Sequence, residues 1–153
     1  MAVTTIRGTV GATMGKPDCC TDAVRRSHRL LRNRLTDLAE EVLAQLPHGS
    51  DLARSRAALV SFVRGEILPR AVREETVAWA ADPAVQQVAR ALPGHHRMLE
   101  VLLEEICADT DGVTAAAAVG ALVLLCDARW DGEERALLPA LAAAGVDLEP
   151  LVD

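Results

Sequence analysis

Two stretches of this chain, Arg70-Ala-Val-Arg-Glu-Glu75 and Arg129-Trp-Asp-Gly-Glu-Glu134, share the pattern Arg-x-x-x-Glu-Glu within apolar, helix-like sequence. On an α-helix, the four-residue spacing places each arginine beside the first glutamate of its motif. Charged side chains on the apolar face of a helix are rare unless they are paired or bind something. The two motifs therefore mark the interior of a helical fold and its candidate functional site. Their stripes comprise Leu59, Phe62, Val63, Glu66, Arg70, Glu74 and Val77, and Leu122, Cys126, Arg129, Glu133, Ala136 and Leu137.

The composition is that of a single helical domain. The chain has 153 residues, of which 50% are hydrophobic and only 2% aromatic, as in helical bundles rather than β-rich folds. A formal net charge of −6 argues against a nucleic-acid-binding surface. The N-terminal sixteen residues contain no apolar signal segment, and the apolar run 115–126 is too short to span a bilayer. We therefore expect a cytoplasmic protein with no membrane partner.

Apolar periodicity predicts an all-α fold, an up-down-up-down four-helix bundle over residues 21–145. Residues 1–20 are expected to be a flexible tail, and residues 146–153 a C-terminal tail. The predicted helices begin at a cap at Thr21 or Asp22, at a cap at Ser50 or Asp51, and at Asp82-Pro83. They cover 21–46, ending before Gly49, then 51–81 with a kink at Pro69, 83–107 with an interruption at Pro93-Gly94, and 113–138.

The predicted topology brings histidines to the depth of the two motifs. His28 is the polar member of the first helical stripe, and folding about residue 49 places it level with Arg70. In the third helix, His96 and Glu100 lie one turn apart and fall beside the segment that holds Arg129, while His95 competes with His96 for the same face. A histidine on such a face is either a hydrogen-bonded core residue or a ligand.

Four cysteines occur, and their spacing matches neither a zinc ribbon nor a CxxC redox motif. Cys19 and Cys20 are either a reactive or metal-binding pair, or two thiols at the end of the tail. Cys107 and Cys126 lie on apolar faces and are expected to be small core residues.

These segments resemble the hemerythrin-like (HHE cation-binding) family. Phe62 to Glu75, with Leu-Pro-Arg where the family has Leu-Pro-His, is similar to its second-helix motif, and Cys126 to Leu141 to its fourth-helix motif. Ser27-His28-Arg29-Leu30 and the segment from His96 to Ile106 resemble its first- and third-helix histidine segments. The resemblance covers residues 22–141.

The resemblance implies a bundle that holds a non-haem di-iron centre, used for dioxygen binding, peroxide or nitric oxide chemistry, or iron sensing. The implied ligand positions are His28, Glu74, His96, Glu100 and Glu133. Arg70 and Arg129 stand where the family has histidines, and a protonated guanidinium offers no lone pair to a metal. In one interpretation, the two arginines replace the metals as charge partners of Glu74 and Glu133. The alternative is that both arginines extend into solvent.

Three functions remain open from the sequence. The first is a metal-free bundle whose Arg/Glu/His-lined core cavity binds or senses a small anionic or carbonyl-bearing ligand, or performs acid-base chemistry with His28, His96 and a glutamate. The core polar pocket would comprise His28, Glu66, Arg70, Glu74, His96, Glu100, Arg129 and Glu133. The second is a residual site for one iron, manganese or zinc ion at His28, Glu74, His96, Glu100 and Glu133. The third is a structural or interaction module with a fossil site.

Overall fold

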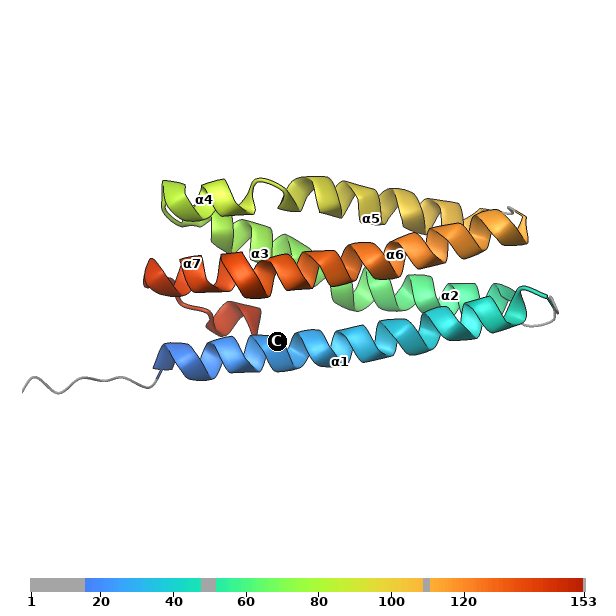
Figure 1. The fold of residues 1–153 in the computed structure, drawn as a ribbon, viewed down its shortest axis with the longest axis horizontal. Coiled ribbons are helices and arrows are strands. Elements are labelled where there is room, and N and C mark those ends of the chain that lie inside the picture. Colours follow the sequence, from blue (N-terminus) through green and yellow to red (C-terminus); the bar gives the residue numbers. More distant parts are fainter. Residues whose placement is uncertain (1–15, 48–51, 109–110, 153) are drawn as a thin grey trace, which may run out of the picture.

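The computed structural model describes residues 16–47, 52–108 and 111–152, and all regular structure in these ranges is helical, with no strand. The expected all-α class is confirmed. The helices form four rods that lie side by side, with successive rods running in opposite directions (Figure 1). In chain order, the elements are α1 (Lys16–Gln45); α2 (Leu52–Phe62), the π-helical turn η1 (Val63–Ile67) and α3 (Leu68–Ala80); α4 (Pro83–Ala89) and α5 (Leu92–Cys107); α6 (Gly112–Gly132), the π-helical turn η2 (Glu133–Leu137) and α7 (Leu138–Ala143); and the 3₁₀ turn η3 (Glu149–Leu151).

Two aspartates cap helices. Asp82 accepts hydrogen bonds from the backbone N–H groups of Ala84 and Val85, with a proline at the start of α4 as predicted. Asp111 accepts from Val113 and Thr114 at the start of α6 in the same way. Each side chain satisfies backbone donors that have no partner inside the helix. The predicted stop at Gly49 and caps at Ser50 and Asp51 lie outside the described residues.

The first helix begins earlier than predicted. α1 already includes Lys16, so a start at Thr21 or Asp22 is wrong, and residues 16–20 belong to the helix rather than to a tail. Pro17 lies in the first turn, where the missing N–H costs no hydrogen bond. The remainder of the expected tail, residues 1–15, lies outside the described residues.

The proline in each long rod follows a π-helical turn instead of a simple kink. Pro69 is the second residue after η1, and Pro139 is the second residue after η2. The N–H of Leu68 bonds to the carbonyl of Val63, and the N–H of Leu138 bonds to that of Glu133, each five residues earlier. A wider turn accommodates a residue that lacks a donor and would clash with the carbonyl four positions back. The extra residue rotates the following helical face by about 100°.

The core has two apolar clusters. One comprises Leu35, Leu38, Ala39, Val42, Leu59, Val60, Val63, Ile67, Leu99, Leu103, Ile106, Ala118, Val119, Leu122, Cys126 and Trp130. The other comprises Val24, Ala78, Val85, Ala89, Leu92, Leu137, Leu138, Leu141, Leu148 and Leu151. Along the chain, His28 falls between Val24 of the second cluster and Leu35 of the first. Arg70 and Glu74 likewise fall between Ile67 and Ala78, and Glu133 falls between Trp130 and Leu137. The interior is thus a polar layer between two apolar ones.

The C-terminal segment packs on the second cluster, so the expectation of a tail at residues 146–153 is wrong for 146–152. Gly145, at φ 69°, ends α7, and the N–H of Val146 bonds back to the carbonyl of Leu141. Glycine adopts this left-handed conformation without steric cost. The turn sends the chain back so that Leu148 and Leu151 become 3% and 1% exposed.

The helix that continues from Gly112 to Ala143 spans 32 residues with a mean hydropathy of 1.5, and by length and composition it could cross a membrane. The expectation that this region is too short to span a bilayer considered only its apolar run. In the described structure, the helix contributes Leu122, Cys126 and Trp130 to the core, and the core helix of a globular fold has the same properties.

Candidate functional site

Five of the eight predicted site residues lie together in the interior. His28 is 0% exposed, Arg129 and Glu133 are 2% exposed, and Arg70 and Glu74 are 3% exposed. α1, α3, α6 and η2 supply them. The alternative in which the arginines extend into solvent is therefore wrong.

Arg70 joins three segments of the chain. Its Nε donates to Glu74 Oε1 at 3.0 Å, one turn along α3. Its two terminal nitrogens donate to Ser27 Oγ on α1 at 2.6 Å and to the carbonyl of Leu151 at 2.8 Å. The docked C-terminal segment thus supplies a neutral acceptor to a buried cation, which helps to satisfy its donors.

Arg129 lies between the two buried glutamates. Its Nη2 donates to Glu74 Oε2 at 3.1 Å, and its Nε lies 2.7 Å from Glu133 Oε1. The Glu133 contact is a short charge contact without hydrogen-bond alignment, because neither Glu133 oxygen has a hydrogen-bond partner in the described structure. Longer bonds of 3.4 Å reach the carbonyls of Leu92 and Ala71. One guanidinium therefore links α6 to α3 and to the start of α5.

His28 faces three carboxyl groups. Its Nδ1 lies 3.0 Å from Glu134 Oε1, while its Nε2 lies 3.5 Å from Glu133 Oε2 and 3.7 Å from Glu74 Oε1. The ring stacks on Trp130, with centroids 6.0 Å apart. Nε2 is buried and has no hydrogen-bond partner among the described residues. The unpaired edge of the imidazole is therefore directed at Glu74 and Glu133.

The two buried glutamates have opposite acidities. Burial by itself would raise the pKa of Glu74, but the imidazole of His28, the guanidinium of Arg129, the neighbouring Glu133 carboxyl and the charge of Arg70 lower it to about 2. Burial and the neighbouring Glu74 charge raise the pKa of Glu133 well above the usual range, and Arg129 offsets this only in part. Two adjacent carboxyl groups rarely both ionise in an apolar interior. The two pKa shifts favour the ionised form of Glu74 and the protonated form of Glu133.

Glu66 does not belong to the site. It is exposed, and Ile67, 2% exposed, occupies the inward position instead. The prediction counted helical turns through η1, where the π-helical turn inserts a residue and rotates the inward face. Placing Glu66 in the core was therefore wrong.

The third-helix residues lie beside the site rather than in it. The Glu100 side chain is 57% exposed, because Leu99 takes the inward position on α5. The His96 side chain is 20% exposed, with Nδ1 3.4 Å from Glu75 Oε1 and Nε2 3.8 Å from Glu100 Oε1. His95 is also partly buried, and burial together with the charge of Arg129 lowers its pKa. The expected convergence of His96 and Glu100 with the other ligands is absent among the described residues.

The second glutamate of each motif was missed. Glu75 Oε1 lies 3.7 Å from Arg129 Nη1, and Glu134 contacts His28. The sequence signal for these two residues is that each motif ends in two consecutive glutamates. A residue about 100° from the buried stripe sits at the edge of the interior, where a long side chain reaches inward.

Three donor groups converge closely enough to hold one cation. His28, Glu74 and Glu133 each offer an atom, and these atoms lie within 4.8 Å of one another. The unpaired His28 Nε2 and Glu133 Oε2 fit such a role. Arg129, however, contacts both carboxylates, and its charge opposes a cation there. The residues present fit one divalent ion, which would compete with the Arg129 guanidinium, but they do not fit two ions.

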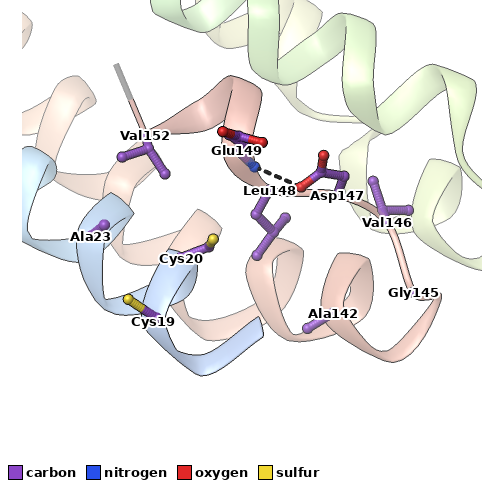
Figure 2. Close-up of a pocket in the computed structure, with 10 residues that line it drawn as sticks. All are labelled: Cys19, Cys20, Ala23, Ala142, Gly145, Val146, Asp147, Leu148, Glu149 and Val152. Carbon is purple, nitrogen blue, oxygen red and sulfur yellow. Dashed lines mark hydrogen bonds between the residues drawn. The ribbon is translucent and has the colours of Figure 1, made fainter. Parts of the chain in front are cut away.

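Among the hollows on the described surface are four of about 240 to 720 Å³, and none of these four is lined by the five buried site residues. Cys19 and Cys20 line one of about 570 Å³, between the start of α1 and the C-terminal segment (Figure 2). The two thiols therefore lie on a helix against folded structure rather than in a tail. Cys126 is buried as predicted, whereas Cys107 is exposed, and placing it in the core was wrong.

Comparison with known proteins gives no assignment: no protein-family model, no curated protein sequence and no solved structure matches this chain.

Proposed function

We propose that this chain is a hemerythrin-like up-down-up-down four-helix bundle in which the guanidinium groups of Arg70 and Arg129 replace bound metal ions. The observation that carries the proposal is the position of Arg129, which contacts Glu74 at 3.1 Å and Glu133 at 2.7 Å while only 2% exposed. Buried carboxylates need a cationic partner to offset their desolvation. In this chain the partner is covalently part of the protein, which removes the need for metal.

The function that follows is binding or sensing of a small molecule without redox chemistry. Arg70 is the contact point, because its Nη2 already donates to a carbonyl oxygen, that of Leu151. A small ligand with a carboxylate or carbonyl group presents the same kind of acceptor and would displace the C-terminal segment from Arg70. His28 and protonated Glu133 would then supply proton donors and acceptors next to it.

A second candidate is a site for one divalent ion. It is favoured by the convergence of His28, Glu74 and Glu133 and by the unpaired His28 Nε2. These three residues would hold an iron, manganese or zinc ion, which would supply Lewis acidity to a bound group. The third candidate, a structural module with a fossil site, differs from the first by the lack of any ligand.

Thermal unfolding with and without metal tests the proposal. For the metal-free bundle, neither a chelator nor added Fe(II), Mn(II) or Zn(II) changes the melting temperature, because no ion binds the native state preferentially. A rise with one of these ions that is lost in His28→Ala would instead establish the second candidate. Small carboxylic and keto acids added to the metal-free protein separate the first candidate from the third, since only the first predicts a higher melting temperature.

A further inference from the structure

A hollow of about 720 Å³ runs along α2 and η1 toward the end of α5, on a part of the surface away from the buried layer. Its floor consists of residues without long side chains, at four-residue intervals: Ala53, Ala57, Ser61 and Gly65. A Cβ atom at Gly65 would meet nothing within 4 Å. The hollow is therefore open space above one helical face.

The sides of the hollow are cationic. Arg56 and Arg64 both line it, in a chain whose net charge is −6. Arg56 Nη1 donates to the carbonyl of Ala108 at 3.2 Å, which holds this side chain against the end of α5, and its Nε is buried without a hydrogen-bond partner in the described structure. Two guanidinium groups on one part of the surface are complementary to an anion.

The same hollow contains a thiol. Cys107 is the last residue of α5, is exposed and lines the hollow together with the two arginines. Its contacts are independent of the proposed function, because neither buried motif reaches this region. A nucleophilic sulfur beside an anion-complementary surface suits a reagent that has both a negative charge and an electrophilic sulfur.

We propose that Cys107 is a modification site for an anionic low-molecular-weight disulfide, which Arg56 and Arg64 select by charge. The Cys107 thiolate attacks one sulfur of the disulfide and forms a new S–S bond, while the other half leaves as a thiolate. Cys107 is oxidised, the disulfide is reduced to one thiol, and the proton of Cys107 passes to solvent or to the leaving thiolate. The product is a mixed disulfide that places an anionic group between the arginines.

The other thiol-bearing hollow serves as an internal comparison. Asp147 and Glu149, rather than arginines, line it with the exposed Cys19 and the half-buried Cys20 (Figure 2). Asp147 Oδ1 accepts from the N–H of Glu149 at 3.1 Å, which holds this carboxylate in the turn. An anionic reagent should therefore be disfavoured at Cys19 and favoured at Cys107.

The experiment compares glutathione disulfide, which is anionic, with cystamine, which is cationic, on the reduced full-length protein, with adducts at each cysteine quantified by mass spectrometry. The ratio of the glutathione disulfide rate to the cystamine rate should be at least about tenfold higher at Cys107 than at Cys19. This is the size expected for two charges about 6 Å from reagents of opposite sign when salt of about 0.15 M screens them. High salt, about 1 M, should remove the difference. Equal ratios at both cysteines would overturn the proposal.

Charge variants test the role of the hollow itself. Arg64→Glu, at an exposed position, should lower the ratio at Cys107 about tenfold, whereas Arg34→Glu, exposed on α1 and outside the hollow, should leave it unchanged. Glu104, one turn before Cys107, opposes the anion, so Glu104→Gln should raise the ratio about threefold. If Arg64→Glu leaves the ratio of the two reagents at Cys107 unchanged, Cys107 reacts as an ordinary exposed thiol and selection by charge is refuted.

Discussion

Arg129 on α6 donates a hydrogen bond across the interior to Glu74 on α3, Nη2 to Oε2 at 3.1 Å, with both side chains at most 4% exposed. An ion pair at this depth contributes little net stability compared with apolar packing, yet breaking it leaves an unpaired buried charge. The pair therefore ties two helices together and makes the fold sensitive to either partner.

Removing this guanidinium should destabilise the fold. We expect Arg129→Ala to lower the free energy of unfolding by about 3 kcal/mol, since the buried Glu74 carboxylate loses one of its two guanidinium partners. Chemical denaturation at neutral pH measures the change. Arg135→Ala is the matched control, because Arg135 pairs with Asp131 at 2.8 Å and at the same four-residue spacing but is 78% exposed; its cost should stay below about 0.5 kcal/mol. Equal effects of the two substitutions would contradict a buried charge layer.

The two buried glutamates should respond differently to amide substitution. Glu74 is ionised and accepts from both arginines, so Glu74→Gln should cost about 3 kcal/mol. The raised pKa of Glu133 favours its protonated form, so the neutral Glu133→Gln should cost less than about 1 kcal/mol. Urea denaturation of both variants tests this asymmetry, and a Glu133→Gln variant as unstable as Glu74→Gln would show that Glu133 is ionised.

The same acidities predict the pH dependence of stability. Folding lowers the pKa of Glu74 from a usual 4.5 to about 2, so its ionised form stabilises the folded state by about 3 kcal/mol. This stabilisation is fully present above pH 4.5 and is lost between pH 4.5 and 2. Glu133 has the opposite sign: its raised pKa makes stability decrease as pH rises above 4.5. Denaturant midpoints across pH 2 to 8 should therefore show a maximum near pH 4 to 5 from this pair. In Glu133→Gln the decline above pH 4.5 should become shallower, and an unchanged profile would contradict the assignment.

Replacing both buried arginines with histidines should create a metal site. In the double variant Arg70→His and Arg129→His, two fixed cations are removed and two imidazoles join His28, Glu74 and Glu133. The variant should be less stable than the parent without metal and regain about 3 kcal/mol when Fe(II) is present at about 100 times its dissociation constant. Thermal unfolding with and without Fe(II) measures this. Adding His28→Ala should abolish the response, and a folded double variant that ignores metal would show that the donors no longer converge.

The residues that sequence periodicity could find are those inside regular helix. His28, Arg70 and Arg129 lie on stripes with the 3.6-residue repeat, and the structure places all three in the interior. Glu66 was wrongly predicted to be buried, because the π-helical turn η1 interrupts that repeat. The local pattern of apolar residues does not indicate the extra residue. A Leu-Pro pair follows each π-helical turn, at Leu68-Pro69 and at Leu138-Pro139, but the pair alone does not predict such a turn.

Helical periodicity cannot predict how irregular segments and edge side chains pack. The C-terminal residues are too few to show a helical repeat, and their docking depends on Gly145 and on the donor that Arg70 offers to Leu151. The contacts of Glu75 and Glu134 likewise depend on the reach of a side chain at the edge of a face, which spacing alone does not describe.

Elemental analysis tests the central claim, replacement of metal by guanidinium, most directly. The parent protein and the Arg70→His, Arg129→His variant are produced in iron-supplemented cells, and their iron, manganese and zinc contents are measured per chain after gel filtration without chelator. The account predicts well under one metal ion per parent chain and a clear increase in the variant, because Arg129 occupies the carboxylates that a cation would need. Two tightly bound iron ions per parent chain would contradict it.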